Sequence, residues 1–168
     1  MSHFSDICTR LVDPQALRQA LEVLGFTVEA VEIQLDMTQE QLNAIALPYA
    51  NSYSDRRSAH VIARHPELRQ QETAIGFLWN VEAEAFVLQC DAYEIRNSTL
   101  GYRWELRNLC DREVEQSLNQ RIQMQHDRAY VQLQYPATQY LITEQLLDDG
   151  IQLVIKPRTD RLAIGAAI

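Results

Sequence analysis

The residues best suited to chemistry in this chain are four histidines and three cysteines, and none of them belongs to a recognisable local motif. The histidines are His3, His60, His65 and His126, and the cysteines are Cys8, Cys90 and Cys110. No histidines form an HxxxH, HExxH or HxH arrangement, and no two cysteines are two or three residues apart. Transition-metal sites need three or four converging ligands, often at such spacings. We therefore expect no metal site and no other cofactor.

Motifs for nucleophilic catalysis and for phosphate binding are also missing. The chain has no Gly-x-Ser-x-Gly sequence, and no cysteine has a histidine beside it. The five glycines are isolated from one another, so neither a Walker A loop nor a dinucleotide fingerprint can be written. An enzyme would have to assemble its site from distant residues, for which His3, Cys8 and Asp91 are candidates.

The densest basic stretch contains Arg56, Arg57 and Arg64, and it lies in a chain with a formal net charge of -8. Arginine side chains suit the recognition of phosphate and carboxylate groups, so these three residues could bind a small anionic ligand. A charged loop beside a strand is more often a solvated surface. The acidic balance argues against a nucleic-acid partner.

A second basic group surrounds an aromatic residue. Arg103 and Arg107 flank Trp104, and arginine and tryptophan are over-represented at the energetic centres of protein interfaces. These residues are therefore candidates for contact with another protein, although Trp104 could equally belong to the core.

The composition is that of an ordinary folded domain. The chain has 168 residues, 46% hydrophobic and 23% charged, which suits a single domain with a core of its own. Three cysteines at wide spacings favour reduced thiols over a disulfide framework. The sequence shows neither a signal peptide nor an apolar run long enough to span a membrane. We expect a soluble protein of the cytoplasm or of a plastid stroma.

Helix-start signals and apolar periodicity predict the elements of the first half. Asp13 can cap a helix whose first residue is Pro14, and Gly25 stands where that helix would end. Thr38 and Gln41 form a capping box for a short second helix. The expected order is a strand over residues 4–11, a helix to residue 24, a strand over 26–35, a helix over 38–47, a loop over 48–57 and a strand over 59–64.

The second half is expected to continue the sheet and then to form a long helix. Strands are predicted over 73–79 and 85–91, and further alternation over 93–95 and 102–106 predicts another hairpin. From Glu113 the apolar residues recur on one helical face as far as Pro136, which would end the helix.

The C-terminal region fits two structures. Residues 137–147 could continue a helix or could equally form a strand, for which Asp149-Gly150 supplies a strong hairpin signal. We predict an α+β fold with one mainly antiparallel sheet, two main helices packed on one of its faces, and a C-terminal β-hairpin. Residues 1–157 would form this single domain, and residues 158–168 a loose tail.

The two ends of the chain resemble a family of proteins. The opening sequence Met-Ser-His-Phe-Ser, with His3, Phe4 and Ser5, is similar to the start of an uncharacterised open-reading-frame family of cyanobacteria, some algal plastids and other bacteria. The segments 74–77 and 147–156 resemble the same family, whose domain has no assigned function. The resemblance implies a strand, an acidic turn and a strand at the C-terminal end, and on this ground we choose the hairpin over a helix for residues 137–147. Residues 38–57 have no counterpart in it and are expected to be an insertion.

The absence of local catalytic motifs and the presence of an Arg/Trp/Tyr-bearing region favour a non-enzymatic accessory or adaptor protein. Such a protein would act by binding another protein, whose identity and stoichiometry the sequence leaves open. The alternatives are a protein that binds a small ligand or anion through Arg56, Arg57 and Arg64, and an enzyme with a site built from distant residues.

Overall fold

The computed structural model describes residues 4–50, 56–68 and 74–159. Its elements follow the order β1 (Phe4–Cys8), α1 (Pro14–Val23), β2 (Thr27–Ala30), α2 (Gln39–Ile45), β3 (Leu47–Ala50), β4 (Arg56–Ala59), β5 (Val61–Arg64), β6 (Ala74–Asn80), β7 (Ala85–Asp91), α3 (Ala92–Arg96), α4 (Thr99–Arg103), α5 (Asp111–Gln134), β8 (Tyr140–Leu147) and β9 (Gly150–Pro157). In the described residues, no helix has the length and apolar character needed to cross a membrane.

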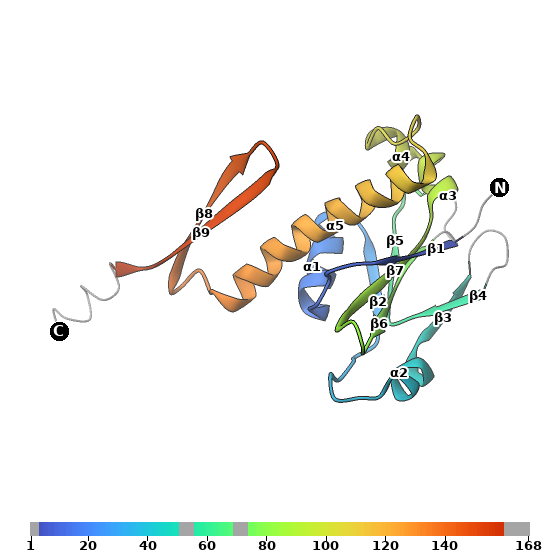
Figure 1. Ribbon diagram of the computed structural model, residues 1–168, viewed down its shortest axis with the longest axis horizontal. Coiled ribbons are helices and arrows are strands. Elements are labelled where there is room, and N and C mark those ends of the chain that lie inside the picture. Colours follow the sequence, from blue (N-terminus) through green and yellow to red (C-terminus); the bar gives the residue numbers. More distant parts are fainter. Residues whose placement is uncertain (1–3, 51–55, 69–73, 160–168) are drawn as a thin grey trace.

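Five antiparallel strands form the central sheet, in the order β1-β7-β6-β5-β2. Strand pairing sets Phe77 of β6 opposite Leu88 of β7, so that both side chains point to the same face. That face packs against α1 and α5, whose leucines and isoleucine complete one buried cluster (Figure 1). The predicted α+β fold, with two main helices on one face of an antiparallel sheet, is confirmed.

The opposite face of the sheet is covered by the two-stranded sheet β3-β4, which follows α2. Tyr49 of β3 lies over Gly76 of β6, and its hydroxyl donates a 2.8 Å hydrogen bond to Gln89 Oε1. A side chain at position 76 would occupy the space of the Tyr49 ring, so this close approach requires glycine. The expected loop over residues 48–57 is therefore wrong where it is described: residues 47–50 and 56–59 are paired strands.

The first helix begins as the sequence predicts. The Asp13 carboxylate accepts a 2.7 Å hydrogen bond from the backbone N–H of Ala16, and Pro14 is the first helical residue. Gly25 follows the end of the helix with φ of 92°, which favours glycine. The capping box of α2 is also confirmed, because Thr38 and Gln41 exchange side chain–backbone hydrogen bonds.

The hairpin predicted over 93–106 is wrong, because the structure has the short helices α3 and α4 there. Asp91 accepts a hydrogen bond from the backbone N–H of Glu94, and Ser98 accepts one from that of Gly101. These two caps begin the helices and override the local alternation of apolar residues. The strand expected over 26–35 is also shorter than predicted and ends at Ala30.

The long helix α5 has 24 residues and is therefore about 36 Å long. It begins beside α3 and α4, crosses the domain and extends beyond it toward the C-terminal hairpin (Figure 1). The hairpin of β8 and β9 is confirmed, with Leu147 opposite Gly150 across the turn Asp148-Asp149. It forms a separate two-stranded sheet that projects from the domain.

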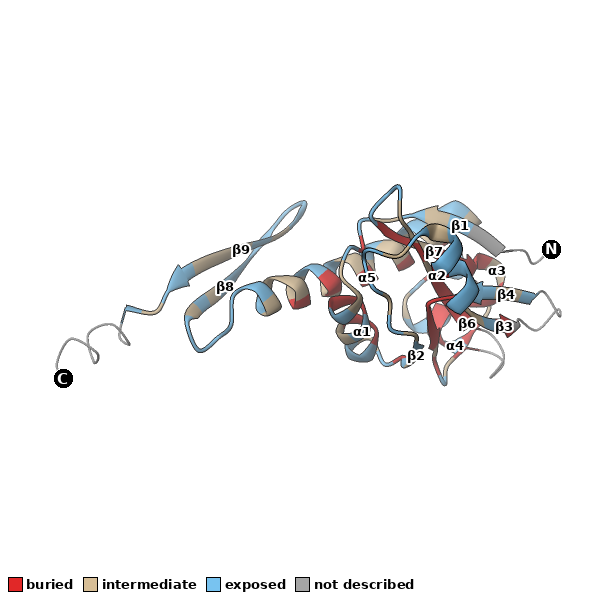
Figure 2. Ribbon diagram, turned by 90° about the horizontal axis from the view of Figure 1, so that it is seen from below, coloured by how far each residue is buried: buried red, intermediate tan, exposed pale blue. Residues whose placement is uncertain are grey.

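The projecting part of the molecule has no buried residue. From Tyr130 to Thr159, every residue is half-buried or exposed, as the tan and pale blue colouring in Figure 2 shows. In the tail, the Arg158 backbone N–H donates to the Gln139 carbonyl at 2.9 Å, whereas residues 160–168 lie outside the described part.

Candidate functional site

The three arginines considered for anion binding do not meet at one place. Arg57 forms a 2.9 Å ion pair with Asp6 of β1. Arg64 forms a 3.1 Å ion pair with Glu29 of β2. Because β1 and β2 are opposite edges of the central sheet, the two pairs lie far apart. Arg56 is exposed, so the described residues form no convergent anion pocket here.

The second basic group lies at the end of α4. The Arg103 guanidinium is 2.9 Å from the carboxylate of Glu67, and the Arg107 guanidinium carbon is 5.5 Å from the centre of the Tyr102 ring. They border a hollow of about 620 Å³, lined by Tyr102, Arg103, Glu105, Arg107 and Asn108. Both cations already have partners, which weakens this hollow as an anion site.

Trp104 is a half-buried residue at the border of the core, not an exposed contact residue. Its ring centre is 6.4 Å from that of Phe26, and the Arg121 guanidinium carbon lies 4.8 Å from it. Arg121 of α5 thus covers the outer side of the indole and connects α5 to the end of α4.

The residues considered for a dispersed enzyme site are also separated. Strand pairing sets Cys8 opposite Val87 and Phe4 opposite Asp91, so Cys8 and Asp91 lie at opposite ends of the β1–β7 ladder. At about 3.3 Å per residue, this separation exceeds 10 Å. His3 lies outside the described residues, while Phe4 and Ser5 begin β1. Among the residues described, no group of three or more potential metal ligands converges.

Two histidines are buried and serve the core. The backbone N–H of Trp79 donates to His60 Nδ1 at 2.9 Å, and His60 Nε2 donates to the Leu42 carbonyl at 2.7 Å, which ties α2 to β6. His65 accepts a 3.0 Å hydrogen bond at Nδ1 from the backbone of Glu67. Burial lowers the pKa of both imidazoles below the ordinary histidine value.

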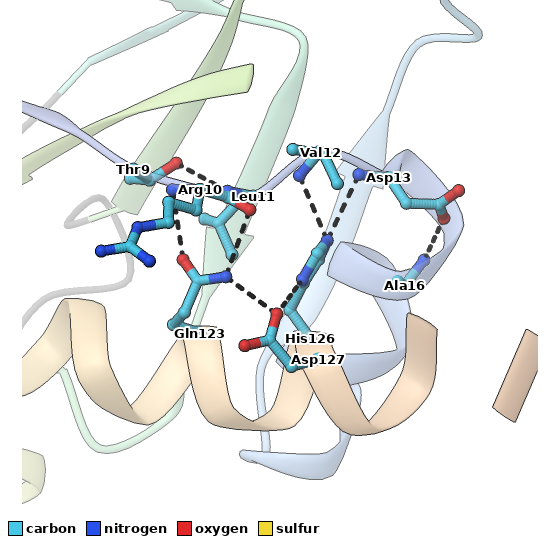
Figure 3. A network of polar contacts seen from close by, with 9 residues as sticks. All are labelled: Thr9, Arg10, Leu11, Val12, Asp13, Ala16, Gln123, His126 and Asp127. Carbon is cyan, nitrogen blue, oxygen red and sulfur yellow. Dashed lines mark hydrogen bonds and ion pairs between the residues drawn. The ribbon is translucent and has the colours of Figure 1, made fainter. Parts of the chain in front are cut away.

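A third histidine, His126 of α5, positions the long helix (Figure 3). Its side chain is 1% exposed, and Nε2 accepts hydrogen bonds from the backbone N–H groups of Val12 and Asp13 at 3.3 and 3.2 Å. Nδ1 then carries the proton and donates to Asp127 at 3.0 Å. The ring thereby fixes α5 against the turn that begins α1.

A neighbouring glutamine extends this contact. Gln123 accepts from the Arg10 backbone N–H and donates to the Arg10 carbonyl, both at 3.2 Å, and it also donates to Asp127 at 2.9 Å (Figure 3). The two side chains hold one side of α5 on the domain. The side of the helix that faces away from the core forms one wall of a cleft, and Gln123 and Asp127 lie at the border of that wall.

The cleft lies between α5 and the hairpin and has a volume of about 570 Å³. Its lining residues are Ser117, Gln120, Arg121, Gln123, Met124, Asp127, Arg128, Asp149, Gly150, Ile151 and Leu153. The α5 wall is polar apart from Met124, whereas β9 supplies the aliphatic side chains. The ion pair between Arg128 of α5 and Glu144 of β8, at 3.0 Å, connects the two walls.

The hairpin face that carries Glu144 is strongly apolar. In an antiparallel pair, residues opposite one another point to the same face, so the register assigns one face directly. Besides Glu144 and Pro157, this face consists of Tyr140, Ile142, Leu146, Ile151, Leu153 and Ile155. Leu146 is 87% exposed. The other aliphatic residues of this face, Ile142, Ile151, Leu153 and Ile155, are half-buried, so the face is only partly covered.

Sequence reasoning missed both the cleft and the role of His126. The alternation of residues 140–147 and 151–155 does encode an apolar face, but it could not show that this face lies off the domain. Comparison of the chain with protein-family models, curated proteins and solved structures finds no match.

Proposed function

We propose that this chain is a non-enzymatic accessory or adaptor protein, which binds another protein in the cleft between α5 and the C-terminal hairpin. The observation that carries the proposal is the aliphatic hairpin face, open to solvent at Leu146 and lining a cleft of about 570 Å³. Contiguous apolar surface of this kind marks interaction sites in folded proteins. An isolated two-stranded hairpin is also marginally stable in water, so it gains most from a partner.

The two walls of the cleft define the chemistry of the partner. The hairpin wall is aliphatic, and the α5 wall carries Gln120, Asp127 and Arg128. A ligand that fits both walls has one apolar side and one polar side, as an amphipathic helix has. We propose such a helix from another protein, with its apolar stripe against Ile151 and Leu153 and its polar side toward α5.

The alternative of an anion-binding protein has less support. Arg57 and Arg64 pair with carboxylates at opposite edges of the sheet, and Arg103 pairs with Glu67. The net charge of -8 likewise disfavours a nucleic-acid partner.

We further propose that the protein is soluble and works in a reducing compartment, the cytoplasm or a plastid stroma. Cys8 and Cys110 are exposed and form no disulfide, as is typical of such compartments. Membership of the open-reading-frame family is a further proposal, supported by the strand, acidic turn and strand at residues 140–157.

The test is affinity capture from native lysate at low and at high salt, with mass spectrometry of the proteins that co-elute. We expect one stoichiometric partner that survives high salt, because apolar contacts are not screened by ions. Leu146 lies opposite the cleft-lining Ile151 on the same hairpin face, so the variant Leu146→Lys should lose this partner. Leu35→Lys is the matched control, because Leu35 is 68% exposed and lies in the loop between β2 and α2. Equal capture by both variants would contradict the proposal.

A further inference from the structure

The outer edge of β9 is a free strand edge with an unusual composition. Only β8 pairs with β9 among the strands in the described ranges. In a hairpin with a two-residue turn, the pair flanking the turn exchanges backbone hydrogen bonds, and bonded and non-bonded pairs then alternate. Leu147 and Gly150 are that flanking pair. Ile151, Leu153 and Ile155 therefore direct their backbone N–H and C=O groups away from β8.

Folded proteins protect free edges with charges or prolines that block pairing with another strand. Every other outer strand in the part of the chain that the structure describes follows this rule: Asp6 on β1, Glu29 on β2, Pro48 on β3, Arg57 on β4 and Glu144 on β8. In β9 the charge and the proline, Lys156 and Pro157, lie at the C-terminal end of the strand, and residues 150–155 contain neither. The central part of this edge therefore has the composition of a strand that is paired on both sides.

We propose that β9 pairs in antiparallel orientation with β9 of a second copy of the chain, across a two-fold axis at Leu153. Side chains of paired residues must share a face, and the outward backbone groups must meet. Both conditions hold when Leu153 lies opposite Leu153 of the second copy and Ile151 lies opposite its Ile155. The two hairpins then form one four-stranded antiparallel sheet with about six backbone hydrogen bonds between the copies.

The residue types favour a second copy as the occupant of this edge. In the two-fold register, aliphatic residues lie opposite aliphatic residues, and Lys156 lies opposite Gly150, so no like charges meet. The outer edge of β8 lacks this property, because the two copies of Glu144 would approach each other near the centre of the strand. A four-stranded sheet with an apolar face is also stable where an isolated hairpin is marginal.

This pairing goes beyond the proposed function, because it concerns the outer edge of β9 and a second copy of the chain. A two-fold axis between antiparallel strands is perpendicular to the sheet, so the apolar faces of both hairpins lie on the same side. The dimer would present two clefts on that side and could hold two partner helices at once. Binding two sites together raises the effective affinity for a partner with two copies of its helix.

The test is the mass of the full-length protein in solution, measured by light scattering over a concentration series. We expect about twice the 19.4 kDa of the chain. Leu153→Lys would place two ammonium groups at the axis and should raise the dimer dissociation constant by at least about tenfold. Leu146→Lys makes the same chemical change on the same hairpin face of the outer strand β8, and it should leave the dimer intact.

A mixing experiment distinguishes loss of the dimer through charge repulsion from loss through misfolding of the variant. Leu153→Lys and Leu153→Glu should each be monomeric and should form a heterodimer when combined, because opposite charges then meet at the axis. A wild-type mass of 19.4 kDa at every concentration overturns the proposal, whether or not another protein binds. A mixture of the Leu153→Lys and Leu153→Glu variants that stays monomeric also overturns the proposal. Leu146→Lys is expected to lose the helix partner but keep the dimer. The capture experiment therefore tests the partner helix, and the mass in solution tests the dimer.

Discussion

Replacing His126 by alanine should destabilise the domain strongly. The imidazole accepts hydrogen bonds from the backbone N–H groups of Val12 and Asp13 and is 1% exposed. His126→Ala removes the only side chain in the described structure that accepts from both groups, and it opens a void between α5 and the turn before α1.

The magnitude follows from these contacts. Leaving partly buried donors without an acceptor costs about 1–3 kcal/mol, and the void adds roughly 1 kcal/mol. We expect the free energy of unfolding to fall by about 2–4 kcal/mol, a large share of the 5–15 kcal/mol that is typical of a domain.

Urea unfolding followed by tryptophan fluorescence measures this loss, since Trp79 is buried in the core. Asp127→Ala is the matched control, because it removes the exposed partner of Nδ1 and leaves both backbone bonds of His126 in place. It should cost less than about 1 kcal/mol. The reasoning is refuted if His126→Ala changes the free energy of unfolding by no more than Asp127→Ala does.

Two further predictions follow from burial. Stability should fall as the pH drops below about 6.5, because the unfolded chain then protonates His60 and His65 while burial lowers their pKa in the folded state. Each histidine contributes at most about 1.4 kcal/mol per pH unit. This loss appears in urea titrations at several pH values, and His60→Gln should flatten the profile. Burial also raises the pKa of the Cys90 thiol well above its usual range, so a maleimide should label Cys8 and Cys110 in the native protein and reach Cys90 only in urea. Rapid native labelling at Cys90 would contradict this.

Local signals in the sequence predicted the elements that are determined locally. Asp13 with Pro14 and Thr38 with Gln41 begin helices in the structure, and both depend on contacts within a few residues. The acidic turn and the alternation around it indicated the C-terminal hairpin, and the family resemblance decided for it over a helix. In each case the interactions that form the element are encoded in adjacent residues.

The errors had two causes, helix caps that compete with alternation and edge strands whose composition resembles a loop. Residues 93–106 alternate like strands, but Asp91 and Ser98 supply helix caps, and the caps prevail. The strands at 47–50 and 56–59 were missed because proline and charged residues suggested a loop. On a strand at the edge of a sheet, proline is tolerated because its missing N–H can face solvent.

The candidate site depends on contacts that are distant in the sequence. His126 meets Val12 and Asp13 across more than 110 residues, and no local pattern indicates that partner. The apolar alternation of β8 and β9 was visible, but only the structure places that face over the outer side of α5 and not on the main sheet.

The most direct test of the central claim is to find what touches the cleft. A photo-crosslinking amino acid at Met124, on the α5 wall of the cleft, is activated in native lysate and compared with the same group at Leu35. We predict a light-dependent adduct with one discrete protein at Met124 and none at Leu35. Identical adducts at both positions, or no adduct at Met124, would contradict the account of the cleft as a protein-binding site.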